Sequence, residues 1–142
     1  MNSGNVVFQD VTIKGGGQQE VVVEVVGGGG LELVRCRVEG GFGLGEGGAV
    51  RVKGSNASLS AKQSRVFSSE ARGLVVREVG KAECEGSDVS GCGIYRVDVQ
   101  GKDSLVRLFH CHVDESRFTN IWVSDGAQVK LQHTTSNGSK GG

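Results

Sequence analysis

One pattern of small and apolar residues recurs along the whole chain at a nearly constant interval. Each copy carries such residues at relative positions 1, 3, 6 and 8. The six copies begin at Val6, Leu31, Leu59, Ala82, Val106 and Val129. Their first residues are therefore 25, 28, 23, 24 and 23 residues apart. A sequence period of roughly 20 to 50 residues is typical of repeat architectures, in which each unit buries its apolar face only by stacking on its neighbours.

A second alternating pattern lies between successive copies and also recurs once per repeat. Its apolar residues are Val23 and Val25, Val50 and Val52, Leu74 and Val76, Val97 and Val99, and Ile121 and Val123. Links that contain Gly or polar residues separate the two patterns and suit tight turns. Alternation with a period of two predicts strands with one face turned inward, each pairing in parallel with its equivalent in the next coil.

We therefore predict an all-β fold, a single right-handed parallel β-helix (β-solenoid) of about six coils over residues 6–136. A short N-terminal lead, 1–5, precedes it, and a flexible polar tail, 137–142, follows. The right-handed form is favoured because the third side varies in length, from a long Gly-rich stretch at 39–48 to a short one at 91–93. The rival prediction is an antiparallel sandwich or barrel, but that fold does not require one pattern at one interval, and Asn-Gly or Asp-Gly hairpin signals are nearly absent.

Three segments that carry the coil pattern, 7–13, 33–38 and 109–113, resemble the right-handed β-helix superfamily that includes the pectate lyases. The resemblance covers residues 6–136 and concerns the coil pattern alone. Members of that superfamily include polysaccharide lyases, polygalacturonases, phage tail proteins and non-catalytic scaffolds, so the fold does not define the function. The polygalacturonase motifs and the calcium-binding aspartate cluster of pectate lyases are missing here, and no catalytic residue is carried over.

Stacking places the outward residues of successive coils in columns about 4.8 Å apart. Relative position 7 gives the column Thr12, Arg37, Arg65, Asp88, His112 and Thr135, and position 5 gives Asp10, Arg35, Gln63, Gly86, His110 and His133. The candidate ligand-binding residues are Arg35, Arg37, Arg65, Asp88, His110, His112 and His133, with Trp122 on the other strand.

These candidate residues allow several interpretations. The three histidines could bind zinc together with Asp88 or Asp114, or His112 and Asp88 could act as an acid and a base on an anionic sugar held by Arg65. The arginines could bind phosphate, sulfate or uronate, but we favour an ordinary cross-strand charge pair for Arg65 and Asp88. We favour a solvated ladder of mixed polar residues, and we predict no catalytic residue, no metal and no cofactor.

Trp122 has its own alternatives, since an exposed indole can stack on a sugar, anchor an interface or simply cover a turn. The four cysteines, Cys36, Cys84, Cys92 and Cys111, lack CxxC spacing and are expected to be reduced. They fit a reducing intracellular compartment or a virion. Basic and acidic residues number 16 each, which argues against nucleic acid as a partner. The sequence has no signal peptide pattern and no apolar segment for a membrane.

The ends of the predicted solenoid point to assembly. The first coil has no evident cap, whereas polar residues, Thr134 and Ser136, occupy inward positions of the last coil. We expect self-association or a protein partner, or a chain that is one piece of a larger protein. The sequence therefore predicts a non-catalytic module for recognition or assembly, of the scaffold or viral structural type. The alternative is a carbohydrate-binding or carbohydrate-active protein similar to polyuronate lyases, with a polysaccharide as ligand.

Overall fold

The computed structural model describes residues 5–15, 21–41, 48–67, 72–90, 95–114 and 119–137, and these form 17 strands. Most of the predicted lead, 1–5, and of the predicted polar tail, 137–142, lies outside them. Successive strands along the chain belong to three different sheets, so that each strand pairs with the one three places further on. Across these ranges the structure has no helix long and apolar enough to cross a membrane.

Every strand pair in the three sheets is parallel. Sheet A contains β1 (Asn5–Gln9), β4 (Gly30–Val34), β7 (Ser58–Lys62), β10 (Lys81–Glu85), β13 (Leu105–Phe109) and β16 (Gln128–Gln132). Sheet B contains β2 (Thr12–Lys14), β5 (Arg37–Glu39), β8 (Arg65–Phe67), β11 (Asp88–Ser90), β14 (His112–Asp114) and β17 (Thr135–Asn137). Sheet C contains β3 (Val21–Val26), β6 (Gly48–Lys53), β9 (Arg72–Arg77), β12 (Tyr95–Gln100) and β15 (Thr119–Ser124).

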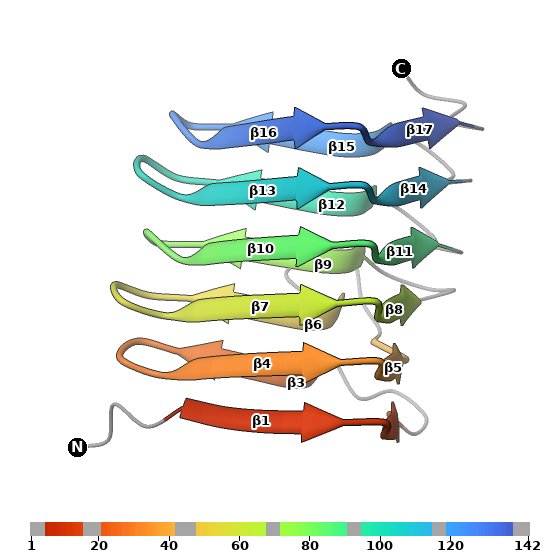
Figure 1. Ribbon diagram of the computed structural model, residues 1–142. Helices are drawn as coiled ribbons and strands as arrows, with labels where there is room; N and C mark the ends of the chain where they lie inside the picture. Colours follow the sequence, from red (N-terminus) through yellow and green to blue (C-terminus); the bar gives the residue numbers. More distant parts are fainter. Residues whose placement is uncertain are drawn as a thin grey trace.

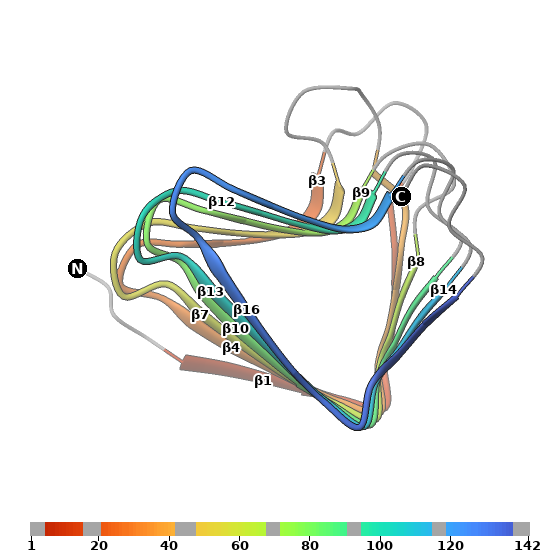
Figure 2. The same cartoon turned by 90° about the horizontal axis from the view of Figure 1, so that it is seen from above.

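The three sheets form the sides of a triangular solenoid, which confirms the predicted all-β parallel architecture (Figures 1 and 2). Figure 2 views the molecule from the C-terminal end, where the chain runs counterclockwise from sheet A through sheet B to sheet C while it rises toward the viewer. The winding is therefore right-handed. Sheets A and B have six strands each and sheet C has five, so the described chain makes slightly fewer turns than the six that were predicted.

Each copy of the sequence pattern forms two strands joined by a sharp corner, which the sequence analysis had not separated. The corner residue has a left-handed backbone, with φ between 50° and 59° in all six windings. A left-handed residue breaks the strand and turns the chain from sheet A into sheet B. These corner residues are Asp10, Arg35, Gln63, Gly86, His110 and His133, and all are exposed, as predicted.

The interior consists of stacked side chains that continue from one winding to the next. The predicted internal column is confirmed by the strand register, which aligns Phe8, Leu33, Ala61, Cys84, Leu108 and Leu131. The four middle members are at most 1% exposed. Burial of such side chains removes apolar surface from water and is the main stabilising term of the fold.

A second internal column, just past the corner, is polar and satisfies the backbone where the sheets bend. The Ser64 hydroxyl accepts a hydrogen bond from the Cys36 N–H at 3.1 Å and donates one to the Lys62 carbonyl at 3.0 Å. The Ser87 hydroxyl accepts from the Ser64 N–H at 3.2 Å, and the Thr134 hydroxyl accepts from the Cys111 N–H at 3.4 Å. Small Ser, Thr and Cys residues at this position therefore link each winding to the next.

Candidate functional site

The candidate site follows the corner between sheets A and B and the outer face of sheet B. Strand register confirms the whole predicted column on that face, Thr12, Arg37, Arg65, Asp88, His112 and Thr135. The adjacent corner column is held by backbone hydrogen bonds between windings, for example from the Arg35 N–H to the Lys62 carbonyl at 3.0 Å. Seven of the eight predicted ligand-binding residues therefore lie on one continuous surface.

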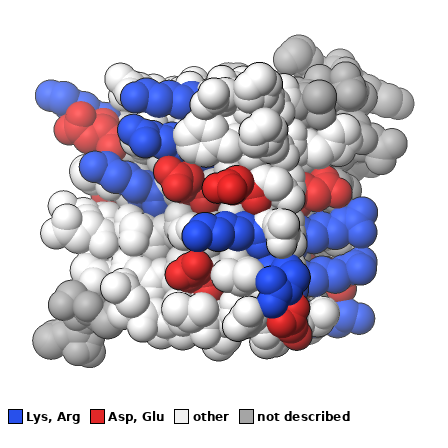
Figure 3. All heavy atoms as spheres, viewed as in Figure 1, with Lys and Arg blue, Asp and Glu red and all other residues white. Residues whose placement is uncertain are grey.

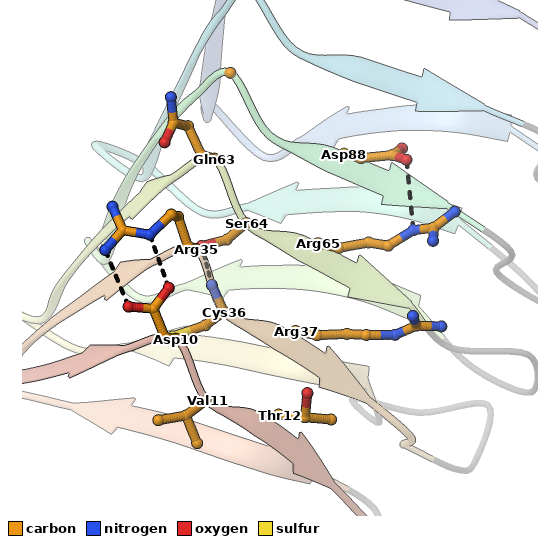
Figure 4. A pocket seen from close by; sticks show the side chains of 11 residues that line it. Asp10, Val11, Thr12, Arg35, Cys36, Arg37, Gln63, Ser64, Arg65 and Asp88 are labelled. Carbon is orange, nitrogen blue, oxygen red and sulfur yellow. Dashed lines mark hydrogen bonds and ion pairs between the residues drawn. The ribbon is translucent and has the colours of Figure 1, made fainter.

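A shallow groove of about 490 Å³ runs along this surface over the first four windings (Figure 4). Figure 4 shows Arg37 and Arg65 extended side by side from neighbouring strands, while Arg35 turns back toward Asp10. The groove is lined by Asp10, Val11, Thr12, Arg35, Cys36, Arg37, Gln63, Ser64, Arg65, Gly86 and Asp88. It is a long, open surface, which suits an extended ligand better than a small enclosed substrate.

Each of the three groove arginines has a carboxylate partner of its own. Arg35 binds Asp10 with two hydrogen bonds, from Nε to Oδ1 at 2.7 Å and from Nη2 to Oδ2 at 3.0 Å. The Arg35 guanidinium lowers the pKa of the Asp10 carboxyl below its ordinary value, chiefly by donating these hydrogen bonds. An anionic ligand would therefore compete with Asp10 for Arg35.

The other two arginines are paired on the face of sheet B. Arg65 Nε lies 3.5 Å from Asp88 Oδ2, which confirms the predicted cross-strand pair. Arg37 Nε donates to Glu39 Oε1 at 2.6 Å on the same strand. Figure 3 shows the resulting mixture, with basic side chains over the lower windings and acidic ones beside them. This surface matches the favoured interpretation, a ladder of mixed polar residues.

The histidines lie at the C-terminal end of the same surface. The rings of His110 and His133 stack with centroids 4.9 Å apart and planes 5° from parallel, which confirms that they are neighbours. The nitrogen lone pairs lie in the ring planes, so two parallel rings do not direct them at one point. Within the part of the chain that the structure describes, no group of three His, Cys, Asp or Glu residues is placed to hold a metal. The structure therefore does not bring His110, His112 and His133 together as one set of metal ligands.

Trp122 lies on sheet C, on a different side of the solenoid from the groove. It is 41% exposed and lies beside Asp98 in the strand register. On the same outer face Arg51 Nη2 lies 2.6 Å from Glu24 Oε2 on the neighbouring strand. The Trp122 indole is therefore a separate exposed patch and not part of the groove surface.

Sequence reasoning missed a buried charge cluster on the outer face of sheet C. Asp98 is fully buried and receives hydrogen bonds from Arg72 Nε and from Arg77 Nη2, the latter at 2.9 Å. The Arg77 Nη1 group also donates to the Asp98 carbonyl at 3.1 Å. The register aligns Val75 with Asp98, so an arginine two residues after Val75 on the neighbouring strand was a signal that could have predicted the Arg77 contact.

The cysteines show no reactive arrangement within the described ranges. Cys36, Cys84 and Cys111 are buried and free, as predicted, and Cys92 lies outside the described residues. Burial raises the pKa of the Cys84 thiol to about 12 and also raises that of Cys111. Because the thiolate is the nucleophile, these two groups are poor candidates for covalent chemistry.

Comparisons with known proteins give no relative for this architecture. No protein-family model matches the chain, and searches of curated proteins and of solved structures find no match either. The function must therefore be argued from the parallel β-solenoid, its groove and its ends.

Proposed function

We propose that this protein is a non-catalytic module for recognition or assembly, and that the ends of the solenoid are its main docking surfaces. One observation carries the proposal: the internal apolar columns end in exposed side chains at both ends. On β1, Val6 is 49% exposed and Phe8 is 37% exposed, although Leu31 and Leu33, the next members of their columns, are buried. At the other end Leu131 is 53% exposed. Contiguous exposed apolar surface marks a site for protein contact.

The backbone supports the same proposal. Among the described strands, β1, β2 and β3 at one end, and β15, β16 and β17 at the other, each have a neighbour on only one side. An unpaired strand edge is a template for another strand. A partner that supplies both a strand and an apolar face would satisfy the two requirements together.

The chain is further proposed to be a non-catalytic relative of the right-handed β-helix superfamily that includes the pectate lyases, of the scaffold or viral structural type. The right-handed winding and the corner between sheets A and B support this placement. The rigid stack, with neighbouring windings about 4.8 Å apart, suits a spacer or docking element.

Sedimentation velocity over a wide concentration range tests the assembly function. We expect an average mass that rises with concentration, and a chain that remains monomeric throughout would overturn the proposal. Phe8→Asp and Leu131→Asp should each lower the association, because each places a charge on an exposed apolar end. Ser58→Asp is the control, since it places a charge on the outer face of β7 in the middle of sheet A, away from both ends. Circular dichroism confirms that each variant retains its strands.

Carbohydrate binding is a second candidate function, favoured by the corner groove. A polyuronate could place its carboxylates along Arg35, Arg37 and Arg65, with His110, His112 and His133 beyond them and Asp88 between the two groups. Trp122 would offer a separate stacking patch on sheet C. A glycan array combined with a lyase assay on uronate polymers tests this candidate. Selective binding that is lost in Arg37→Ala would support it, and silence in both assays would overturn it.

A further inference from the structure

We propose that copies of this chain stack head to tail along the solenoid axis. In this joint, β16 and β17 of one copy pair in parallel with β1 and β2 of the next copy. The inference rests on the proposed assembly function and deepens it by naming the occupant of the open ends, which is a second copy of the chain.

Strand direction favours this joint over one between two like ends. All neighbours in sheets A and B are parallel, and a head-to-tail stack preserves that direction because both copies wind in the same sense along one axis. A joint between two N-terminal ends or two C-terminal ends would reverse one copy and oppose the strands. Only the head-to-tail arrangement can continue the internal columns without changing the pairing geometry.

The internal residues of the two end windings match when the register is continued by one step. β13 pairs with β16 so that Leu108 lies opposite Leu131 and Val106 opposite Val129. The same step across the joint places Leu131 opposite Phe8 and Val129 opposite Val6 of the next copy. Leu131, Phe8 and Val6 are 37% to 53% exposed in the separate chain, so the joint would cover the apolar surface left open at both ends.

The outward residues also match in this register. Gln132 falls opposite Gln9 and Gln128 opposite Asn5, and amide pairs of this kind can hydrogen-bond across strands. At the corner, His133 falls beside Asp10. Lys130 falls opposite Val7. The described residues of β16, β17, β1 and β2 therefore bring no two like charges together across the joint.

Sheet C does not take part in the proposed joint between copies. It has one strand fewer than sheets A and B, so the joint is formed by those two sheets. The apolar groove beside β3, lined in part by Val6, Phe8, Val23 and Val25, adjoins the joint, which would cover its Val6 and Phe8 side. Because the contact uses different surfaces on the two copies, it does not close, and repetition produces a filament.

Disulfide cross-linking tests the register directly. In the double variant with Gln9→Cys and Gln132→Cys, the two new thiols would lie on directly opposed residues of neighbouring copies. Parallel neighbours about 4.8 Å apart are within the usual Cα separation of a disulfide. The two positions are five windings apart within one chain, roughly 24 Å by strand spacing, so no bond can form inside a copy. Mild oxidation should therefore give a ladder of dimers, trimers and larger species on a non-reducing gel.

The controls separate the two proposals. Each single variant should show only the background level of cross-linking. A mixture of the two single variants should give disulfide-linked dimers that contain one Gln9→Cys chain and one Gln132→Cys chain. The pair Gln9→Cys and Gln128→Cys should give no ladder, because Gln128 lies four residues from Gln132 on β16. The unsubstituted chain reports the background from its four natural cysteines. Association by sedimentation without the Gln9–Gln132 ladder would overturn the head-to-tail joint and leave the assembly function standing. Absence of association would overturn both.

Discussion

The middle and the end windings of this solenoid carry the same kinds of residues in different surroundings. Leu108 and Leu131 belong to one internal column and to adjacent strands, yet Leu108 is fully buried and Leu131 is 53% exposed. The two residues occupy the same position of the repeat. Burial in this fold is therefore conferred by the neighbouring winding on each side, and the loss of one neighbour converts a core position into a surface.

The same contrast holds for charged residues. Asp98 in the fourth winding and Asp10 in the first are each bound by arginine, but Asp98 is fully buried while Asp10 is exposed. A buried carboxylate depends on its partners because water cannot replace them, whereas an exposed carboxylate can exchange its partner for water. The buried charge pairs of Asp98 should therefore matter for stability, and the exposed pair of Asp10 and Arg35 should matter little.

Asp98→Asn tests the largest of these differences. The change removes the carboxylate that both Arg72 and Arg77 bind inside the protein, and loss of one partner of a buried ion pair costs about 3 to 5 kcal/mol. The free energy of unfolding, measured in urea, should fall by that order. Asp10→Asn is the matched variant and should leave the urea midpoint close to that of the parent. Equal effects of the two substitutions would contradict the contrast.

Leu108→Ala and Leu131→Ala test the apolar column. Truncation of a fully buried leucine costs about 2 to 5 kcal/mol because it also leaves a cavity. Leu131 is half exposed, and in the monomer its truncation should cost well under about 2 kcal/mol. Urea unfolding at low protein concentration measures both. If the copies stack as proposed, the cost of Leu131→Ala should grow with protein concentration, while that of Leu108→Ala should not.

Ser64→Ala tests the polar column inside the corner. The Ser64 hydroxyl accepts the hydrogen bond of the Cys36 N–H, and a buried donor left without a partner costs about 1 to 3 kcal/mol. The free energy of unfolding should fall within that range. Ser58→Ala is the control, because Ser58 is exposed on the outer face of β7 in the same winding, and it should change stability by no more than about 0.5 kcal/mol. A silent Ser64→Ala would show that another group satisfies the Cys36 N–H.

Much of the fold could be predicted from the sequence because the repeat interval and the alternation of apolar residues recur in every winding. The interval between Val6, Leu31 and the later copies predicted parallel stacking, and the strand register confirms each predicted neighbour in the Phe8 column and the Arg37 column. The corner was not predicted because positions 3 and 6 of the repeat were assigned to one continuous segment, although the chain turns between them. In the structure, a left-handed residue such as Arg35 produces that shift.

The candidate site was harder to predict than the fold. A column assigns which residues are neighbours, but it does not give the direction of a side chain. His110 and His133 are adjacent as predicted, yet their rings stack instead of converging. The Asp98 cluster was missed for a related reason, since Arg77 reaches Asp98 diagonally across the strands and the columns were compared only directly.

The smallest expected effect concerns acid and the Arg35 contact at the exposed end of the solenoid. Hydrogen bonds from Arg35 hold the pKa of Asp10 below its ordinary value of 3.8 in the folded protein. A carboxyl with a depressed folded pKa stabilises the protein above its unfolded pKa, and this contribution is lost as the pH falls through the folded pKa. The parent should therefore be slightly more stable than Asp10→Asn at pH 6, and the difference should vanish as the pH falls below about 3.8. Urea midpoints of the two proteins between pH 6 and pH 2.5 measure this, with Arg35→Gln as the matched variant that removes the other partner. A difference that stays constant across this range would mean that the Arg35 contact does not depend on the charge of Asp10.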